Sequence, residues 1–218
     1  NTAVGVYNRI IGSTLEKTDV ILVTGGCSGL GKELVLELLR RGYPHIVVFD
    51  IHIDGKIKFK GVHYFECDVS DIEQIHNAHE AIKSEIGTVT CVFNNAGVMI
   101  GKSLIEMTVS EINKLVNINL VSNFYMNKTL LPDMISNKKG YIVTVASVLG
   151  FMTPANLTVY GATKAGQIAM HEALSHELRY YSENIKTLLI CPGQLKTPMF
   201  EKVKNPSDII APEIQPSY

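Results

Sequence analysis

The sequence predicts an α/β fold in which a doubly wound parallel sheet, of strand order 3-2-1-4-5-6, carries helices on both faces. Short apolar runs alternate with longer segments of helical periodicity between residues 20 and 190, and this alternation is typical of strand–helix–strand units. The chain has 218 residues, of which 46% are apolar, so it is long enough for the core of one domain.

The predicted strands are short apolar runs bounded by turn residues. A continuous apolar run is expected where a strand is buried on both faces of a sheet. By this criterion strands are predicted at Val20–Thr24, Ile46–Phe49, His63–Glu66, Val89–Phe93, Tyr141–Val145 and Lys186–Ile190.

The predicted helices follow from apolar stripes and from capping residues. Leucines at positions 30, 34, 38 and 39 share one stripe and predict a helix over Gly29–Arg41. Ser70 with Glu73, and Thr108 with Glu111, fit the capping-box pattern of a helix start. These boxes predict helices to about residue 86 and towards residue 131, and a longer helix is predicted over about residues 157–181.

The pattern predicts one dinucleotide-binding domain over residues 1–218, with an N-terminal extension at 1–18 and part of a substrate lid at 198–218. Only 12 residues separate Asp50 from His63. This is short for a crossover, so a trimmed connection or missing residues are expected there. After Pro198 the sequence is polar and proline-rich, and a final strand is expected to be absent from this chain.

Composition and charge exclude several classes of protein. The formal net charge is −1 and the basic residues form no dense block, so no nucleic-acid surface is expected. No metal-ligand spacing occurs, and the four cysteines are expected to be buried free thiols: Cys27, Cys67, Cys91 and Cys191. No run of 18 apolar residues occurs, so no membrane span is predicted. Because the chain begins with Asn1, membrane or lipid-droplet association is expected only through an upstream anchor, with the domain on the cytoplasmic face.

A glycine-rich turn links the first predicted strand to the first helix, with the sequence TGGCSGLG at 24–31. Glycines permit a tight turn and let backbone N–H groups approach a pyrophosphate, and the helix start adds a favourable dipole. A glycine-rich loop without a ligand is the alternative, and the position between a buried strand and an amphipathic helix argues against it. The turn predicts cofactor contacts from Gly25, Cys27, Ser28, Gly29, Leu30 and Gly31.

Asp50 ends the second predicted strand, 19 residues beyond Gly31. A carboxylate here can accept hydrogen bonds from the adenosine ribose hydroxyls and repels a 2′-phosphate. The glycine turn contains no Arg or Lys to bind that phosphate, so NAD(H) is favoured over NADP(H). The alternatives are a loop carboxylate without this role and a phosphate bound by Lys56 or Lys58. His52 is expected to be an ordinary loop residue.

Tyr160 and Lys164 lie four residues apart and share one face of the predicted helix. A phenol, whose usual pKa is near 10, is a poor base at neutral pH, and an adjacent ammonium is expected to lower that pKa. Ser147 follows the fifth predicted strand, at the edge where ligands bind in such sheets. Its hydroxyl can bind a substrate oxygen while Tyr160 exchanges a proton and a hydride moves to or from a nicotinamide.

Several further motifs accompany these residues in a fixed order: CDVS at 67–70, NNAG at 94–97, NINL at 117–120, VAS at 145–147, YGATK at 160–164 and CPGQLKT at 191–197. With the glycine turn and Asp50, they make the sequence from Val20 to about Phe200 resemble the short-chain dehydrogenase/reductase family. The resemblance implies an oxidoreductase with Asn119, Ser147, Tyr160 and Lys164 as its catalytic residues. Asn119 would hold a water that relays protons to Lys164.

The same resemblance implies the remaining cofactor contacts. Asp68 would contact the adenine, Val69 would support the adenine pocket, and Thr197 would bind the nicotinamide carboxamide. The other implied contacts are Asn95, Ala96 and Gly97 in the cleft wall, Pro192 and Gly193 beside the nicotinamide, and Tyr160 with Lys164 at its ribose. The family also implies a homodimer or homotetramer that packs through the helices at about 108–131 and 157–181.

A narrower likeness concerns the substrate. GYIVTVAS at 140–147 and CPGQLKTPMF at 191–200 are similar to the branch that contains retinol dehydrogenases and 17-beta-hydroxysteroid dehydrogenases. This likeness implies an apolar alcohol or ketone, of lipid, steroid or retinoid type. One interpretation of the nearby apolar residues is a substrate wall, and ordinary packing is the other: Leu149, Phe151, Met152, Met199 and Phe200.

Two other functions fit parts of the pattern. A regulatory protein that senses NAD(H) without turnover would use the same glycine turn, but it would not need the four catalytic residues. Epimerisation or dehydration of a nucleotide sugar is typical of relatives with a larger C-terminal domain, and the short stretch after Phe200 argues against it. We therefore expect NAD(H)-dependent interconversion of an alcohol and its carbonyl compound.

Overall fold

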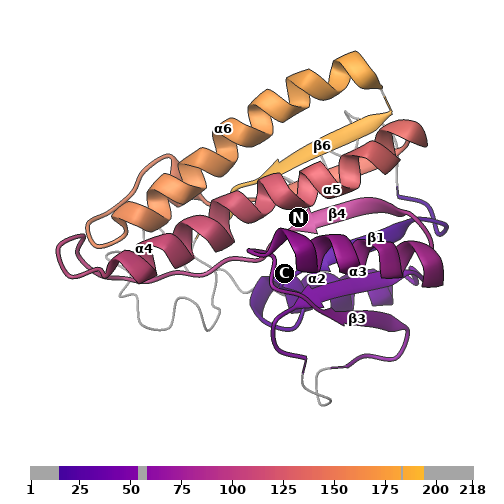
Figure 1. The fold of residues 1–218 in the computed structure, drawn as a ribbon, viewed down its shortest axis with the longest axis horizontal. Helices are drawn as coiled ribbons and strands as arrows, with labels where there is room; N and C mark the ends of the chain where they lie inside the picture. The colour runs from indigo at the N-terminus through magenta and orange to yellow at the C-terminus, as the bar shows by residue number, and fades with distance from the viewer. Residues whose placement is uncertain (1–14, 54–57, 183, 194–218) are drawn as a thin grey trace.

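The computed structural model describes residues 15–53, 58–182 and 184–193 of the chain. Its described part contains one parallel sheet of order β3-β2-β1-β4-β5-β6 (Figure 1). The strands are β1 (Val20–Thr24), β2 (Ile46–Asp50), β3 (Val62–Glu66), β4 (Val89–Asn94), β5 (Gly140–Val145) and β6 (Ile185–Ile190). The strand order predicted from the sequence is confirmed.

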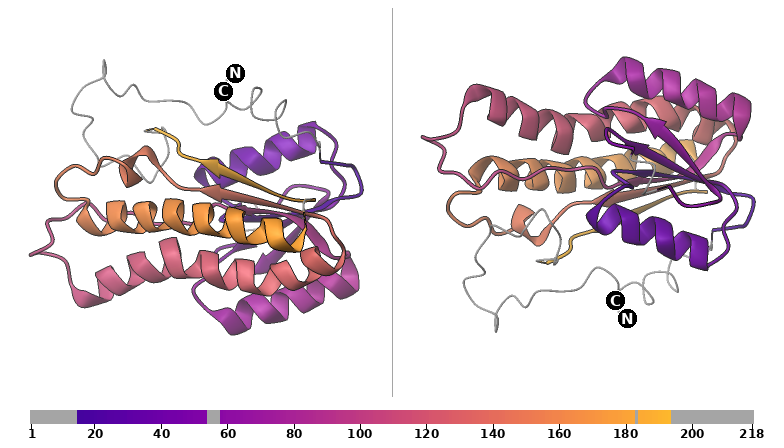
Figure 2. Two further views of the ribbon diagram at one scale, coloured as in Figure 1. Left: turned by 90° about the horizontal axis from the view of Figure 1, so that it is seen from above. Right: turned by 90° about the horizontal axis from the view of Figure 1, so that it is seen from below.

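Helices connect the strands and cover both faces of the sheet (Figure 2). They are α2 (Gly29–Arg40), α3 (Ile72–Glu85), α4 (Val109–Val116), the π-helix η1 (Asn117–Val121), α5 (Ser122–Ser136), the 3₁₀ turn η2 (Val148–Gly150) and α6 (Thr158–Tyr181). Helix α2 packs on one face, and α3, α5 and α6 pack on the other. This arrangement confirms the doubly wound α/β class.

The first strand shows why its apolar run is continuous. Side chains alternate between the two faces of a strand. Val20 and Leu22 belong to the cluster that includes Ile75 of α3, whereas Ile21 belongs to the cluster that includes Val35 of α2. All of β1 is buried, because helices cover it on both sides and every position must therefore be apolar or hydrogen-bonded.

One of the two predicted capping boxes is present. The helix predicted from Thr108 begins with that box. The helix predicted from Ser70 begins differently, because Asp71 is its N-cap and accepts hydrogen bonds from backbone N–H groups of the first turn, including that of Glu73. The Ser70 hydroxyl instead donates to Asp68 at 2.7 Å, so it is not free to cap the helix. The predicted Ser70 box is wrong.

The helical segment predicted from residue 108 continues to Ser136 but is not uniform. Residues Asn117–Val121 form a π-helical segment between α4 and α5. Such a segment shifts the backbone hydrogen-bond pattern by one residue and is frequent at functional sites. Asn119 lies within it and is fully buried.

The connection between β2 and β3 is short, as predicted. Its described residues, 51–53 and 58–61, contain no helix. Most of the predicted N-terminal extension and all of the predicted lid at 198–218 lie outside the described residues.

The predicted state, a buried free thiol, is confirmed for three of the four cysteines. All four are free, with Cys27, Cys67 and Cys91 buried and Cys191 partly exposed. None of the described helices is long and apolar enough to cross a bilayer. Among the same residues, no cluster of three or more His, Cys, Asp or Glu side chains has an arrangement that could hold a metal ion.

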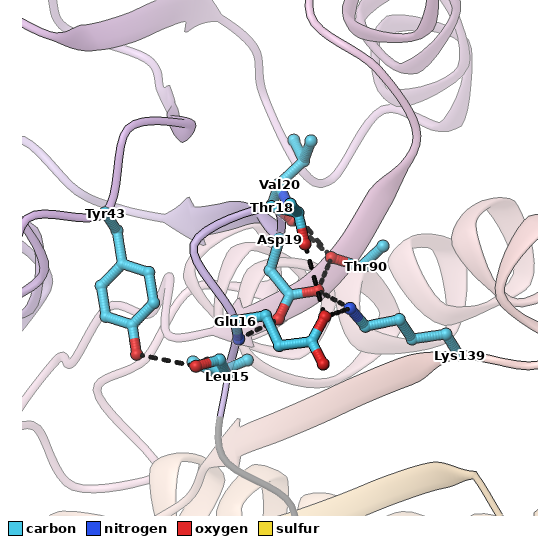
Figure 3. A network of polar contacts seen from close by, with 8 residues as sticks. All are labelled: Leu15, Glu16, Thr18, Asp19, Val20, Tyr43, Thr90 and Lys139. Atoms are coloured by element: carbon cyan, nitrogen blue, oxygen red, sulfur yellow. Dashed lines mark hydrogen bonds and ion pairs between the residues drawn. The ribbon is translucent and has the colours of Figure 1, made fainter.

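A polar network around Asp19 joins the amino ends of three strands (Figure 3). The buried Asp19 carboxylate accepts hydrogen bonds from the backbone N–H of Glu16 at 2.6 Å and from the Thr90 hydroxyl at 2.8 Å. Lys139 Nζ lies 2.8 Å from the same carboxylate. Because these residues lie at the starts of β1, β4 and β5, the network stabilises the edge of the sheet opposite the glycine turn.

Candidate active site

A cleft of about 470 Å³ opens at the carboxyl edge of the sheet, within the range of roughly 300–1,000 Å³ that is typical of small-molecule sites. Residues that follow all six strands line it. Most of the predicted site residues are among them: Gly25, Ser28, Gly29, Leu30, Asp50, Asp68, Val69, Asn95, Ala96, Gly97, Ser147, Tyr160, Lys164, Pro192 and Gly193. Cys27, Gly31 and Asn119 lie behind this wall, and Thr197 lies outside the described residues.

Backbone geometry explains the glycines of the turn. Gly25 has a φ of 67° and Gly29 a φ of 50°, in the left-handed region that favours glycine. Gly31 is required for a different reason, because a Cβ there would lie 2.1 Å from the Gly25 carbonyl oxygen and 2.6 Å from Asn95 Nδ2. The turn is therefore folded tightly against the start of α2. The first residues of α2 line the cleft, so the positive end of the helix dipole points into it, an arrangement that favours an anion.

Asp50 connects the glycine turn to the second strand. One carboxylate oxygen accepts a hydrogen bond from the backbone N–H of Cys27 at 2.9 Å, and the other accepts one from the N–H of His52 at 3.3 Å. Burial, together with the charge of Asp50, raises the pKa of the Cys27 thiol to about 11. The thiol is therefore neutral at pH 7, and Cys27 contacts Asp50 through both its backbone N–H and its side chain.

Hydrogen bonds within the protein fix the loops after β3 and β4. The Thr24 hydroxyl accepts hydrogen bonds from the N–H groups of Asn95 and Ala96, both at 2.9 Å. The Asn95 amide donates to the Thr24 carbonyl oxygen, also at 2.9 Å. In the loop after β3, the Asp68 carboxylate accepts hydrogen bonds from the N–H and hydroxyl of Ser70 at 2.8 and 2.7 Å.

Ser147, Tyr160 and Lys164 lie together at the other end of the cleft. Ser147 follows β5, whereas Tyr160 and Lys164 lie on the first two turns of α6, and all three are buried. Lys164 Nζ is 5.8 Å from the centre of the Tyr160 ring and donates to the Val145 carbonyl oxygen at 3.0 Å. The side chains of Ser147 and Tyr160 are hydrogen-bonded to each other.

Burial dominates the protonation of both α6 residues. It raises the pKa of Tyr160 to about 12, while the hydrogen bond with Ser147 acts in the opposite direction. It also lowers the pKa of Lys164 to about 8, against the effect of the nearby Cys191. The prediction that the lysine lowers the pKa of Tyr160 is therefore wrong for this structure, because desolvation of the phenolate is the larger effect. At neutral pH the Tyr160 hydroxyl is protonated.

Asn119 joins the cleft wall to α6 from behind. Its side-chain amide forms two hydrogen bonds with the backbone of Val98: the oxygen accepts one from the N–H at 2.8 Å, and the nitrogen donates one to the carbonyl oxygen at 2.9 Å. The same amide donates to the Thr163 hydroxyl at 3.2 Å. Because Thr163 precedes Lys164, Asn119 connects the loop after β4 to the helix that carries the lysine.

The residues proposed as a substrate wall are not brought together by the described part of the chain. Leu149 packs against the cluster that contains Leu157 and Tyr160. Phe151 and Met152 are 70% and 80% exposed, and none of the three lines the cleft. Met199 and Phe200 lie outside the described residues.

The structure adds cleft residues that the sequence did not identify. These are Phe49, Ile51, Cys67, Val98, Lys114, Ile118, Val145 and Ala146. His52 also lines the cleft, although it was expected to be an ordinary loop residue. For Ile118, the sequence offered one signal, its position directly before Asn119. Lys114 lies on α4 and reaches the cleft through the tertiary packing of that helix.

Comparison with known proteins shows what this chain is similar to. The family model described as short chain dehydrogenase matches residues 19–208. The chain is 41% identical over 213 residues to the uncharacterized oxidoreductase YDL114W of Saccharomyces cerevisiae, covering 94% of this chain and 69% of the relative. It is 32% identical to retinol dehydrogenase 10-B of Danio rerio and to estradiol 17-beta-dehydrogenase 11 of Pongo abelii, covering in each case 91% of this chain and 68% of the relative.

Solved structures give the same result for the fold. ElxO with NADP bound superposes with a TM-score of 0.77 at 25% identity, covering 84% of this chain and 77% of that one. A short-chain dehydrogenase from Streptomyces avermitilis superposes with a TM-score of 0.76, also at 25% identity, covering 88% of this chain and 75% of that one.

Proposed function

The chain belongs to the short-chain dehydrogenase family, and from this premise we propose that it is an NAD(H)-dependent oxidoreductase that interconverts an apolar alcohol and its carbonyl compound. One observation carries the proposal. A single cleft is lined at one end by the glycine turn and Asp50, and at the other by the buried Ser147, Tyr160 and Lys164.

The residues of the cleft fit a nicotinamide dinucleotide. At the glycine turn, a Cβ on Gly25 would lie 3.1 Å from the Cα of Ala96 and one on Gly31 would meet the turn itself. The glycines therefore let the turn fold tightly against the loop after β4 and the start of α2. Such a turn, followed by a helix start, is the arrangement that binds a pyrophosphate. The volume of about 470 Å³ matches a ligand of this size class.

Preference for NAD(H) is supported by the position of Asp50. The half-buried carboxylate lines the cleft at the end of β2, where it would accept hydrogen bonds from the ribose hydroxyls and repel a 2′-phosphate. The NADP bound by ElxO belongs to that protein. Of the two lysines considered as alternative phosphate ligands, the described one, Lys58, is exposed and does not line the cleft.

The catalytic residues divide the proton chemistry between them. A nicotinamide held in this cleft would supply the hydride acceptor for oxidation of the alcohol and the hydride donor for reduction of the carbonyl compound. In reduction, Tyr160 gives its phenolic proton to the substrate oxygen, and in oxidation the phenolate takes that proton back. Ser147 donates a hydrogen bond to the same oxygen, and the Lys164 ammonium balances the charge of the phenolate. We propose that Asn119 holds a water molecule that relays protons to Lys164.

An apolar substrate is proposed from the relatives. Retinol and estradiol are the apolar alcohols in the names of two of them. In this chain a side of the cleft contains Val98 and Ile118, next to a cluster that contains Leu115 and Met107. Such surroundings favour transfer of a hydrocarbon substrate out of water.

The proposal is tested by turnover and by two matched tyrosine variants. The protein is mixed with NAD⁺ or NADP⁺ and a panel of long-chain alcohols, sterols and retinol, and cofactor reduction is followed at 340 nm as the usual absorbance assay. Tyr160→Phe is expected to lower kcat by roughly 10²–10⁴-fold, the size of a general acid–base contribution. Tyr180→Phe, at a side chain that is 90% exposed, is expected to leave kcat unchanged.

Three results would contradict the proposal in different ways. Equal loss of kcat in both variants would remove the assigned role of Tyr160. Higher kcat/KM with NADP⁺ would overturn the cofactor preference. Tight NADH binding with no turnover on any substrate would favour an NAD(H)-sensing regulatory protein.

The domain organisation, assembly and location of the protein are also proposed. We infer that residues 1–218 form one domain, that it assembles as a homodimer or homotetramer, and that it lies on the cytoplasmic face. Exposed aromatic side chains at Phe124, Tyr180 and Tyr181 support packing through α5 and α6. Light scattering of the purified protein tests the assembly, because a monomeric mass at micromolar concentration contradicts it.

A further inference from the structure

Two helices far apart in the sequence present matching rows of buried polar residues. Asn119, Asn123 and Asn127 lie four residues apart in η1 and α5, and Thr163, Gln167 and His171 lie four residues apart in α6. We call these six residues the polar seam. All six are at most 5% exposed, whereas buried helix positions are normally apolar.

The two rows are at matching levels. The helices run side by side in the same direction (Figures 1 and 2). The hydrogen bond of 3.2 Å from Asn119 to Thr163 joins the first level of the seam. One helical turn further along each helix places Asn123 level with Gln167, and a second turn places Asn127 level with His171.

Two polar strand residues lie beneath the lowest level of the seam. Asn94 of β4 donates to Asn127 at 3.0 Å, and His171 Nδ1 lies 2.8 Å from the Thr144 hydroxyl of β5. Asn94 and Thr144 are direct neighbours in the parallel register of these strands. The third level thus joins polar groups from two helices and two strands, and the middle level, Asn123 and Gln167, lies between it and the hydrogen-bonded first level.

Polar atoms without a hydrogen-bond partner are concentrated at the second and third levels of the polar seam. Among the described residues, six buried side-chain atoms have no hydrogen-bond partner within the protein, and five of them are here: Asn94 Oδ1, Asn123 Oδ1, Asn127 Nδ2, Gln167 Nε2 and Gln167 Oε1. Gln167 is fully buried with both amide atoms unpaired, so exchanging its oxygen and nitrogen would not satisfy it. Buried polar groups of this kind are ordinarily satisfied by internal water, which typically makes about three hydrogen bonds.

The seam is connected directly to the proposed catalytic residues. The Asn123 amide donates to the carbonyl oxygen of Asn119 at 3.0 Å, within the π-helical segment. Thr163, at the first level, donates to the carbonyl oxygen of Tyr160 at 2.7 Å. A change at the middle level therefore reaches Asn119 in one contact and Tyr160 through Thr163.

We propose that Asn123 and Gln167 bind buried water between α5 and α6, and that this water-linked contact positions Asn119 and α6 for the proton chemistry of the site. Asn123 and Gln167 are positioning residues in this proposal, because neither lines the cleft. The effect on catalysis rests on the proposed function, whereas the water site itself does not.

The first test is a high-resolution crystal structure of the protein with NADH. Ordered water is expected within hydrogen-bond distance of the Gln167 amide and of Asn123 Oδ1. The proposal would be overturned if no ordered water lay beside Gln167 and Asn123 and the Gln167 amide formed hydrogen bonds directly with protein groups. This test needs no turnover, so it remains decisive if the proposed reaction is not observed.

The second test is kinetic and uses variants that keep side-chain volume. Gln167→Met and Asn123→Leu are each expected to lower kcat about tenfold while KM for NAD⁺ stays within about twofold. The kcat of the double variant is expected to equal that of the slower single variant, because both substitutions break the same water-linked contact. Leu178→Ala, at a buried α6 position outside the seam, is the stability control and is expected to lower Tm without changing kcat.

Three kinetic outcomes would overturn the positioning role. In the first, the fold-loss of kcat in the double variant equals the product of the two single fold-losses. In the second, only KM changes, and in the third, kcat is unchanged in both single variants. Variants that fail to fold are replaced by Gln167→Glu and Asn123→Ser, which keep a polar group at each position and are expected to retain the water and most of kcat. Loss of kcat in these variants with the water still ordered would count against the proposal.

Discussion

Replacement of Gly31 by alanine sets two physical effects against each other. Gly31 lies in the first turn of α2, where alanine is favoured over glycine by up to about 1 kcal/mol of helix propensity. Helix propensity alone therefore predicts that Gly31→Ala stabilises the protein. The tertiary structure predicts the opposite.

The magnitude follows from the distances around the added methyl group. The new Cβ would lie 2.1 Å from the Gly25 carbonyl oxygen and 2.9 Å from the Gly25 carbonyl carbon, whereas non-bonded heavy atoms pack at about 3.5 Å or more. The turn must therefore move by about 1 Å. Overpacking of this kind costs about 1–3 kcal/mol, which exceeds the propensity gain over most of that range.

The displacement also affects binding, because the same turn forms the proposed pyrophosphate site. A misplacement of about 1 Å can cost on the order of 100-fold in function. We expect Gly31→Ala to lower Tm by about 2–4 °C for each kcal/mol lost and to raise the Kd for NADH at least tenfold. Thermal unfolding and titration of NADH fluorescence measure these quantities.

Gly101→Ala is the matched control, because a Cβ at Gly101 meets no atom within 4 Å. This variant is expected to keep the Tm and the NADH affinity of the parent protein. The reasoning is refuted if Gly31→Ala is as stable as Gly101→Ala and binds NADH equally well.

Three further predictions concern cofactor choice, pH and the sheet edge. Asp50→Asn keeps an acceptor for the Cys27 N–H and removes the charge, so the ratio of kcat/KM for NADP⁺ to that for NAD⁺ is expected to rise at least about tenfold in steady-state assays. Burial lowers the pKa of His171 from 6.5 to about 4. The unfolded chain therefore binds more protons than the folded protein between these pH values, and the free energy of unfolding should fall by about 3 kcal/mol as pH drops through this window. His171→Gln should remove that slope in urea titrations. Asp19→Ala should lower the free energy of unfolding by about 2–3 kcal/mol because charged hydrogen bonds are lost, whereas Glu16→Ala, at an exposed partner of the same Lys139, should cost less than about 1 kcal/mol.

Each of these predictions has an outcome that contradicts it. An unchanged cofactor ratio in Asp50→Asn would show that the carboxylate does not discriminate between the two cofactors. Equal pH dependence in His171→Gln and the parent protein would assign the acid sensitivity to other groups. Equal unfolding free energies for the Asp19 and Glu16 variants would show that burial of Asp19 adds nothing to the network.

Features that depend on local backbone and periodicity were predictable from the sequence. The strand order, the glycine turn and the capping box at Thr108 were confirmed by the structure. The glycine turn and the capping box need only the residue types along a short segment, because apolar periodicity and left-handed φ angles are local properties. The strand order follows from the alternation of strands and helices along the chain, because crossovers between parallel strands are right-handed. The predicted Ser70 capping box is absent because the Ser70 hydroxyl donates its hydrogen bond to the carboxylate of Asp68 in the same loop.

Features that depend on what other segments place nearby were decided by the tertiary structure. The sequence alone placed Tyr160 and Lys164 on one helical face and identified Ser147 as their partner. It led to the wrong direction for the pKa of Tyr160, because the burial that raises that pKa comes from distant segments that pack over α6. The polar seam has the same origin: each row is visible as a four-residue spacing, but only the packing of α5 beside α6 brings Asn123 and Gln167 to one level. Periodicity depends on residues that are close in the sequence, whereas desolvation and the pairing of buried polar groups depend on segments that are distant in the sequence and packed together in the fold.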